Sequence, residues 1–327
     1  MVMSISHYLK EIGRGKEGAR NLNTQQAREL MLLILSGQVS DLELGAFCIA
    51  MRIKGETPQE MIGFLEAMES NIKKVSLVNG LSEASKSVQT NKPVILIPSY
   101  NGARKLPNLT PLLAGALAQR QFPVLVHGHA TEDKRISTQE LYEKLDWPVN
   151  VDPKATNTIT LSQGQTLFVS MKCLSLKISE LLDVRKTIGL RNSSHSLVKI
   201  LNPVDPQCPV LQLSNYTHPE YLESMSHTFE QLERNVLFFR GTEGEAVADP
   251  RRTPKMTGFV RGKPQTMVEQ DQGTVSSDFN YPQTTDSSQT AQYIKKVLQG
   301  ELEMPYSIQA QINAIEALSL KICNPTL

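Results

Sequence analysis

The sequence predicts a two-part α/β protein, in which a small helical domain precedes a larger domain built on a mainly parallel sheet. Two patterns indicate this fold class. The N-terminal residues combine helix start signals with apolar residues at helical spacing. From residue 93 onward, short apolar runs alternate with a helical segment, which is typical of buried parallel strands. We expect a helical domain over residues 1–75, joined by helices from about 172–190, and an α/β domain over 76–327.

Three helices are predicted at the N-terminal end of the chain. Thr24 is the expected N-cap of the first helix, and Asp41 begins the second. In the third, Thr57 is the cap, Pro58 occupies the first helical position, and Glu60 is placed to close a capping box. Three short helices with short connections predict a small bundle.

A strand–helix–strand unit predicts the sheet of the second domain. Residues 93–98 are an apolar run bounded by prolines, residues 123–128 are a second run, and the apolar segment 112–118 between them is helical in pattern. This order gives a right-handed parallel crossover. Residues 236–239 are expected to add a strand, and residues 268–291, rich in Gln, Thr, Ser and Asp, to form a mobile surface loop.

Composition excludes several classes of protein. Hydrophobic residues make up 40% and charged residues 20%, as in ordinary globular proteins. No apolar run approaches the roughly 18–20 residues of a membrane span, and the N-terminus lacks a secretory signal pattern. The cysteines lie far apart, which argues against a zinc site and a disulfide framework: Cys48, Cys173, Cys208 and Cys323. We therefore expect a cytoplasmic protein with no membrane partner.

The net charge of +1 conceals an uneven distribution along the chain. Residues 91–200 carry 14 Lys and Arg against 8 Asp and Glu, whereas residues 201–327 carry 10 against 15. Such polarity is informative about partners rather than about the fold. The positive middle third is a candidate surface for a polyanion, and a merely solvated surface explains the same charges equally well.

Several segments of the chain carry a family resemblance. The N-terminal sequences LSGQVSD (35–41) and RIKGETP (52–58), the strand–loop–helix at 94–118 and the segment from Gly189 to Pro203 resemble the anthranilate phosphoribosyltransferases and pyrimidine nucleoside phosphorylases. The resemblance covers most of the chain in register. It implies a small helical domain, a larger α/β domain, and a homodimer joined through the helical domains.

A narrower resemblance rests on three short motifs. EIGRGK (11–16), IPSYNGARK (97–105) and GTEGE (241–245) are similar to sequences of YbiB-type proteins, a branch of the same superfamily. This resemblance implies the transferase fold together with binding of nucleic acid without sequence preference.

The glycine-rich loop of the transferase family is altered in this chain. Phosphoribosyl transfer needs a turn whose backbone N–H groups can approach a pyrophosphate closely. Where the family has Gly-Thr-Gly-Gly-Asp, residues 98–102 are Pro-Ser-Tyr-Asn-Gly. Pro98 has no N–H to donate, Tyr100 adds a large ring, and Gly102 replaces the family's carboxylate. Classical anthranilate phosphoribosyltransferase activity is therefore not expected.

Two further parts of the family's mechanism are missing as well. Residues 126–130 are Val-His-Gly-His-Ala where the family has Lys-His-Gly-Asn-Arg, so both cations are absent. The family's adjacent Asp-Glu pair, which holds magnesium, is not present in residues 240–245, although Glu245 matches one of these carboxylates. Arg240 would repel a cation there. We expect no metal, no cofactor and no catalytic residues.

Some polar residues of the phosphate loop remain, and they keep a second interpretation open. The remnant consists of Ser99, Asn101, Gly102, Asn108 and Thr110. Asn108 and Thr110 match residues that contact phosphate in the family. The alternative interpretation is that they only cap the following helix. Arg191 matches an arginine that anthranilate-using members direct at the substrate carboxylate, or it only orients its own segment. The alternative function is thus a glycosyl or phosphoribosyl transferase with an altered substrate. His127 and His129 share a strand face and could hold a metal, but capping of the strand end explains them too.

Basic residues in segments that border the family's interdomain cleft predict a nucleic-acid surface. They are Arg104, Lys105, Lys134, Arg135, Arg185, Lys186, Arg191, Lys199, Arg240, Arg251, Arg252 and Lys255. A row of cations can bind phosphate backbones without a base-reading helix, and Tyr100 could stack on an exposed base. We predict a homodimeric, non-specific nucleic-acid-binding protein for DNA, single-stranded DNA or RNA. The near-neutral net charge argues against it.

Overall fold

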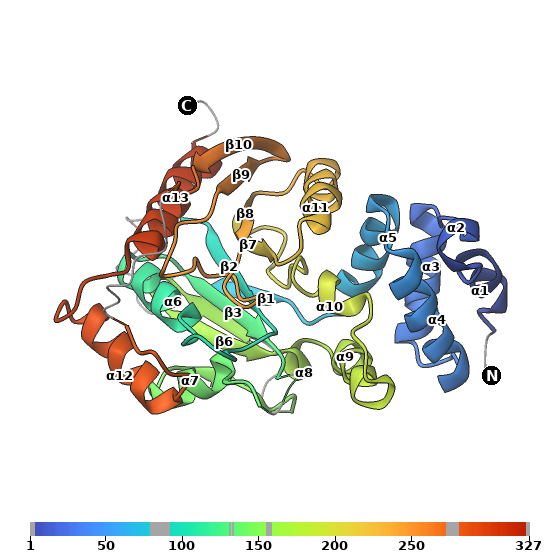
Figure 1. The fold of residues 1–327 in the computed structure, drawn as a ribbon, viewed down its shortest axis with the longest axis horizontal. Helices are drawn as coiled ribbons and strands as arrows, with labels where there is room; N and C mark the ends of the chain where they lie inside the picture. The colour runs from blue at the N-terminus through green and yellow to red at the C-terminus, as the bar shows by residue number, and fades with distance from the viewer. Residues whose placement is uncertain are drawn as a thin grey trace.

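The computed structural model describes residues 4–78, 92–130, 132, 134–154, 159–272 and 281–324. A helical bundle at one end adjoins a larger α/β body (Figure 1). The bundle contains α1 (Ser6–Ile12), α2 (Gly15–Gly18), α3 (Thr24–Leu35), α4 (Asp41–Lys54) and α5 (Pro58–Glu69). The predicted fold class, a helical domain followed by an α/β domain with a mainly parallel sheet, is confirmed.

Local capping determines where the bundle helices begin. The Thr57 hydroxyl accepts the Glu60 N–H at 3.3 Å and the Glu60 carboxylate accepts the Thr57 N–H at 2.9 Å, which confirms the predicted capping box of α5. The expected cap of α3 was wrong by one residue. Asn23 accepts the Gln26 N–H at 2.8 Å, and Thr24 is the first helical residue.

The carboxylate of Glu60 also ties three parts of the bundle together. It is fully buried, accepts the Leu22 N–H at 2.9 Å, and lies 2.6 Å from the Lys54 ammonium at the end of α4. A buried carboxylate is costly unless it is paired and hydrogen-bonded. Here both oxygens have donors, so the same residue caps α5 and fixes the preceding segments against it.

Within the described residues, the sheet of the α/β body has eight strands in the order β10-β9-β8-β7-β2-β3-β6-β4. The three predicted strands are confirmed as β2 (Val94–Ser99), β3 (Val124–Gly128) and β8 (Val236–Arg240), and the predicted helix is α6 (Thr110–Gln119). The other strands are β4 (Val149–Asn150), β6 (Thr166–Ser170), β7 (Val210–Tyr216), β9 (Met256–Val260) and β10 (Lys263–Val268). The pairs involving β9 are antiparallel and the rest are parallel. A separate parallel pair joins β1 (Val75–Val78) to β5 (Ile159–Ser162).

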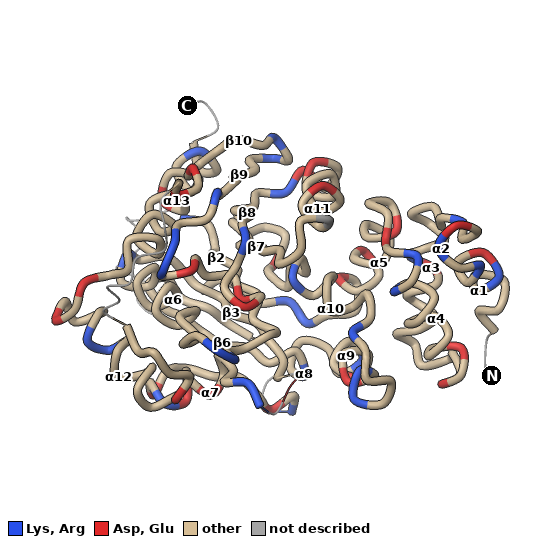
Figure 2. Tube along the Cα trace, in the orientation of Figure 1, with Lys and Arg blue, Asp and Glu red and all other residues tan. Residues whose placement is uncertain are grey.

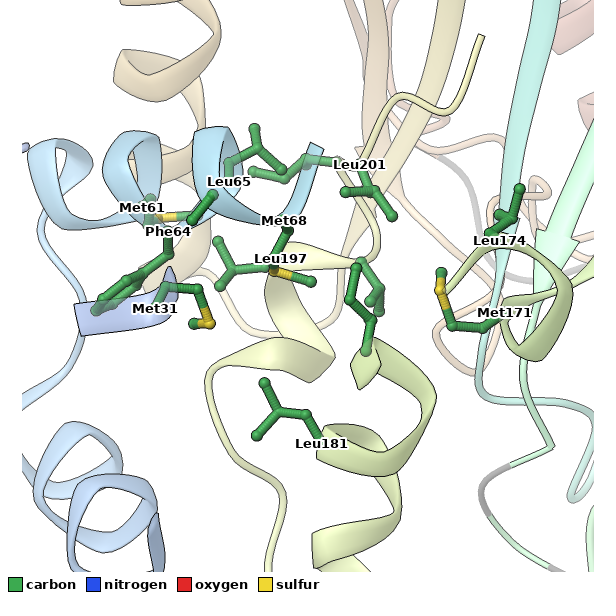
Figure 3. Packing of buried hydrophobic residues seen from close by; sticks show 14 of the residues in the cluster. Met31, Met61, Phe64, Leu65, Met68, Met171, Leu174, Leu181, Leu197 and Leu201 are labelled. Carbon is green, nitrogen blue, oxygen red and sulfur yellow. The ribbon is translucent and has the colours of Figure 1, made fainter. Parts of the chain in front are cut away.

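One hydrophobic core continues from the bundle to the sheet. Figure 3 shows Met68 of α5 beside Leu197, with Leu181 of α9 (Leu176–Ile188) below them. The linking helices are α8 (Met171–Leu174), α9 (Leu176–Ile188), α10 (Ser194–Leu197) and α11 (Glu220–Gln231). The opposite face of the sheet packs against α6, α7 (Thr138–Lys144), α12 (Ser287–Leu298) and α13 (Tyr306–Cys323).

The predicted loop at residues 268–291 is shorter than expected. Val268 belongs to β10, and α12 begins at Ser287 with the Asp286 carboxylate accepting the Gln289 N–H at 2.8 Å. Residues 273–280 within the predicted loop lie outside the described residues. None of the helices in the described ranges combines the length and hydropathy that a membrane span requires.

Candidate functional site

The loops that follow β2, β3 and β8 lie at the carboxyl edge of the parallel strands, where α/β sheets commonly bind ligands. The loop after β2 is held by two carboxylates from the turn after β8. Glu245 is buried, and its carboxylate accepts the N–H groups of Asn101 and Gly102, each at 2.7 Å. The backbone donors that a glycine-rich turn would offer to a pyrophosphate are therefore occupied by the chain itself.

Glu243 holds the next part of the same loop. Its carboxylate accepts the N–H groups of Arg104 at 2.8 Å, Lys105 at 3.0 Å and Leu106 at 3.2 Å. The turn that presents both carboxylates needs a glycine between them. Gly244 has φ of +91°, and a Cβ there would lie 1.5 Å from Nδ2 of Asn101. The two carboxylates of the GTEGE motif thus occupy the N–H groups of the loop after β2 in place of an external anion.

The remaining polar residues of the phosphate-loop remnant satisfy one another. The hydroxyl of Ser99 and the amide of Asn108 both donate to Oγ1 of Thr138, at 2.7 and 2.9 Å, and Asn108 Oδ1 accepts the Thr110 N–H at 3.1 Å. The helix-capping interpretation of Asn108 fits this last contact. The pocket between this loop and the loop after β3 has only about 10 Å³, which is room for one water molecule.

Tyr100 does not occupy the position expected for base stacking. Its side chain is buried, and its hydroxyl lies 2.7 Å from Nδ1 of His127. Burial raises the pKa of Tyr100 and lowers that of His127 to about 3, so both groups are neutral at physiological pH. The expectation that the ring stacks on an exposed base is therefore wrong for this loop conformation.

The metal-binding alternatives do not fit the geometry either. Nε2 of His129 donates to the Asp183 carboxylate across 2.9 Å, while His127 points to Tyr100. Glu243 and Glu245 use their oxygens on backbone N–H groups. Within the described residues, no three His, Cys, Asp or Glu side chains come together as a metal site. The turn after β8 consequently does not fit the magnesium that the family resemblance implies.

A cluster of arginines surrounds Glu132 in the loop after β3. Its carboxylate lies 2.8 Å from Arg185, 2.9 Å from Arg135 and 3.4 Å from Arg191. Burial opposes ionisation of Glu132, but hydrogen bonds and charge from Arg185 and Arg135 outweigh it and hold its pKa at about 2. One carboxylate thus faces three permanent cations. Nη1 of Arg185 has no hydrogen-bond partner among the described residues.

These arginines belong to a continuous set that we call the basic strip: Arg104, Lys105, Lys134, Arg135, Arg185, Lys186 and Arg191. The loops after β2 and β3 are joined by backbone pairing of Ala103 with Ile136, and Glu132 joins the second loop to α9 and the segment after it. Arg104, Lys105 and Lys134 are exposed. The exposed Lys186 ammonium lies 2.9 Å from Asp183. The fold therefore brings together seven of the residues predicted from sequence.

Sequence reasoning missed two residues that organise the strip. Glu132 was not singled out, because its partners Arg185 and Arg191 are distant in the sequence. Arg52 of α4 was quoted only as part of a family motif, yet its guanidinium donates to the Arg191 carbonyl at 3.1 Å and extends the strip to the bundle. The positive charge of Arg52 within that motif was the signal from which the sequence could have indicated its place in the strip.

The other five predicted basic residues lie elsewhere. Lys199 is partly buried and donates to the Gly244 carbonyl at 3.2 Å, and burial lowers its pKa to about 8. Arg251 forms a bidentate ion pair with Asp249, with its Nε and Nη2 atoms 2.9 and 2.7 Å from the two carboxylate oxygens. Arg251 lines a separate pocket beside β8, together with Arg240, Arg252 and Lys255.

A polar pocket of about 430 Å³ lies between the bundle and the α/β body. Arg191 and Lys199 line it together with His195 and Asn215. Nε2 of His195 and both polar atoms of the Asn215 side chain are buried and have no partner among the described residues. Burial, followed by the charge of Arg191, lowers the pKa of His195 to about 3, so its ring is neutral. The pocket offers neutral hydrogen-bonding groups beside three cations, Arg52, Arg191 and Lys199, and one carboxyl group, that of Glu56.

Comparison with known proteins places the chain in a family. Residues 6–71 match the helical bundle domain of a glycosyl transferase family. The chain is 37% identical to YbiB of Escherichia coli, itself named as uncharacterised, over 95% of this chain and 92% of YbiB. It is 26% identical to an anthranilate phosphoribosyltransferase of Metallosphaera sedula, over 62% of this chain but only 54% of that enzyme.

Solved structures share the fold across nearly the whole chain. The anthranilate phosphoribosyltransferase of Thermus thermophilus superposes with a TM-score of 0.66 at 18% identity, covering 98% of this chain and 90% of that one. The Saccharomyces cerevisiae enzyme, solved in complex with PRPP and Mg, gives 0.65 at 16% identity, with the same coverage. With YbiB as a relative along nearly its full length, this chain belongs to the glycosyltransferase family 3, anthranilate phosphoribosyltransferase-like superfamily.

Proposed function

We propose that this protein binds nucleic acid through the basic strip, on a scaffold whose phosphate loop is occupied by its own carboxylates. The observation that carries the proposal is the convergence of three arginines on the single carboxylate of Glu132. The cations in excess of that carboxylate can neutralise phosphates and release counterions, a mode of binding that reads no sequence.

The whole-molecule charge does not drive this binding. Figure 2 shows Lys and Arg segments interspersed with Asp and Glu segments along the trace, in keeping with the net charge of +1. The attraction must therefore be local, and it should act within about one Debye length, roughly 8 Å at physiological ionic strength. A backbone-binding strip of this kind accepts DNA, single-stranded DNA or RNA.

The proposal includes a homodimer joined through the helical bundles. One face of α4 exposes apolar and small residues at helical spacing, namely Leu42, Ala46, Ile49 and Ile53, with the half-buried Gly45 between them. Leu42 is 85% exposed and Ile53 54% exposed. A second copy packed on this face would remove it from water, and two basic strips on one particle would raise the apparent affinity for a long strand.

The test is a salt titration of a labelled single-stranded oligonucleotide in the cytoplasmic pH range. The variant Arg104→Glu/Lys105→Glu should bind at least tenfold more weakly, because it removes two cations and adds two anions beside phosphate. The matched control is Lys295→Glu/Lys296→Glu, which reverses two exposed lysines on α12, a helix on the other side of the sheet. Equal losses in both variants would show that the protein is only generally attractive to polyanions, and the strip would not be the site.

A second candidate function is a glycosyl or phosphoribosyl transferase with an altered substrate. The polar pocket between the bundle and the α/β body supports it, because His195 and Asn215 have hydrogen-bonding atoms without a partner among the described residues. Calorimetry with phosphoribosyl pyrophosphate and magnesium tests it. Saturable binding followed by turnover near 1 per second or faster would replace the nucleic-acid proposal with this one.

A further inference from the structure

The pocket beside β8 has the size and lining of a small-molecule site. It encloses about 490 Å³ between the carboxyl end of β8, the loop 241–255, the end of β7 and the start of α11. Pockets that hold small ligands commonly range from about 300 to 1,000 Å³. It shares no lining residue with the 10 Å³ remnant behind the loop after β2, and it adjoins the pocket between the bundle and the α/β body through Tyr216 and Thr217.

Positive charge exceeds negative charge in this pocket. Its four cations are Arg240, Arg251, Arg252 and Lys255, and its two carboxylates are Glu243 and Asp249. Both carboxylates are engaged, Glu243 by backbone N–H groups and Asp249 by Arg251. Among the described residues, Arg252 donates to one carbonyl, that of Asp271, at 3.2 and 2.8 Å, and that contact does not compensate its charge. The lining favours an anionic group.

Apolar residues also line the pocket. They are Leu106, Pro219, Leu222 and Pro254, and Leu222 is 41% exposed. The ring of Tyr216 also lines the pocket and is held against Phe238, with the ring centroids 5.1 Å apart. Rigid apolar and aromatic surface suits the face of a planar ring.

An unused hydroxyl completes the lining. Oγ1 of Thr253 has no hydrogen-bond partner among the described residues, although the side chain is only 2% exposed. Buried hydroxyls in folded proteins are normally hydrogen-bonded, so an unpartnered one at a pocket wall points to a ligand that supplies the partner. Excess positive charge, apolar and aromatic lining residues and an unpartnered hydroxyl together favour an amphipathic anionic ligand.

We propose that this pocket binds one nucleotide unit, with the base against the apolar and aromatic lining residues and the phosphate beside Arg240, Arg252 and Lys255. As part of a strand, this unit deepens the proposed nucleic-acid function and rests on it. A free nucleoside monophosphate presents the same chemistry. The two sources are separated by experiment.

The first arm titrates AMP, adenosine and inorganic phosphate into the full-length protein and measures heat and NMR shifts. AMP should bind saturably and at least tenfold more tightly than either fragment, because only AMP uses both the cationic and the apolar parts of the pocket. Arg240→Gln/Lys255→Gln should weaken AMP binding about tenfold or more, since charge-assisted hydrogen bonds are lost. Thr253→Val, which keeps the shape of the side chain, should weaken it by a smaller factor. Absence of saturable AMP binding, or no loss in the double variant, would overturn the proposal.

The second arm repeats the oligonucleotide titration with the same pocket variants. If strands bind through the basic strip while AMP does not bind, the pocket inference is wrong and the proposed function stands. If AMP binds at the pocket and strands do not bind, the proposed function is wrong and the pocket takes a free nucleotide. Thermal unfolding of each variant checks that its substitutions leave the fold intact.

Discussion

The loop after β2 and the cluster around Glu132 both place hydrogen-bond donors around carboxylates. In the loop the donors are backbone N–H groups that the carboxylates satisfy, whereas around Glu132 the cations outnumber the carboxylate. In the loop, two carboxylates accept five backbone N–H groups, so no backbone donor among residues 101, 102 and 104–106 is left for an external anion. In the cluster, one carboxylate faces three guanidinium groups. In the first region the protein's own carboxylates fill the anion site. In the second region, positive charge remains that an external phosphate can neutralise.

The largest effect, on the free energy of unfolding, should come from removing the carboxylate of Glu245 that fills the anion site of the loop after β2. Replacing the buried Glu245 with alanine leaves the N–H groups of Asn101 and Gly102 without their acceptor, and unfolding should become easier by about 3 kcal/mol. Urea denaturation measures this loss, with the exposed Glu301→Ala on the far side of the sheet as a control expected to change stability by about 0.5 kcal/mol or less. If the vacated N–H groups can donate to an outside anion, added pyrophosphate should raise the stability of the Glu245→Ala protein and leave the wild type unchanged. Stability equal to wild type would show that Glu245 does not hold the loop.

The second largest effect should be a loss of affinity for long strands when each particle carries one basic strip instead of two. Introducing Leu42→Glu and Ile49→Glu on α4 should convert the proposed dimer to a monomer and weaken binding to a long strand by about tenfold to a hundredfold, with little change for a short one. Sedimentation velocity and binding to oligonucleotides of two lengths test this. Leu320→Glu on α13 is the matched control, since Leu320 is also well exposed at 62%. A wild-type protein that sediments as a monomer at micromolar concentration would remove the bivalent part of the proposal.

The contrast between the two regions also explains how far the sequence could predict them. The capping box of Thr57 and Glu60 and the apolar run of β2 are determined within a few residues, and both were predicted correctly. The pairing of Arg191 with Glu132 joins residues 59 positions apart and depends on how α9 meets the sheet. Local patterns carry no information about such contacts.

Tyr100 and Arg251 illustrate two different reasons for incomplete prediction. A tyrosine in a loop can face solvent or the interior, and the partner that places it inside, His127, comes 27 residues later. Arg251, in contrast, is paired with Asp249 only two residues away, a short-range signal that the sequence did contain. Asn23 and Thr24 are both good caps, so the one-residue error at α3 reflects a near-equal choice.

A smaller effect should follow from removing the single carboxylate of the cluster. Glu132→Gln raises the excess charge of the strip by one, so nucleic acid should bind more tightly, by about fivefold at 0.1 M salt, with a steeper salt dependence. This direction is opposite to that of variants that remove cations. The matched control is Glu180→Gln, which makes the same change on α9 at an exposed position paired with Lys177. Weaker binding by Glu132→Gln would indicate that Glu132 mainly positions the arginines.

The smallest effect is a pH dependence of stability that originates in the same carboxylate. The pKa of Glu132 is about 2 in the folded protein and 4.5 for the ordinary side chain, so folding favours the ionised form. Its contribution is fully present above pH 4.5 and is lost as the pH falls through about 2, because the unfolded chain then binds the proton more readily. Urea unfolding of wild type and Glu132→Gln between pH 6 and pH 2 isolates this contribution, since other groups titrate alike in both proteins. The gap in unfolding free energy should be constant above pH 5 and should narrow steadily below pH 4.5. A constant gap down to pH 2 would mean that the three arginines do not stabilise the carboxylate, and the excess of charge at the cluster would then lack its structural basis.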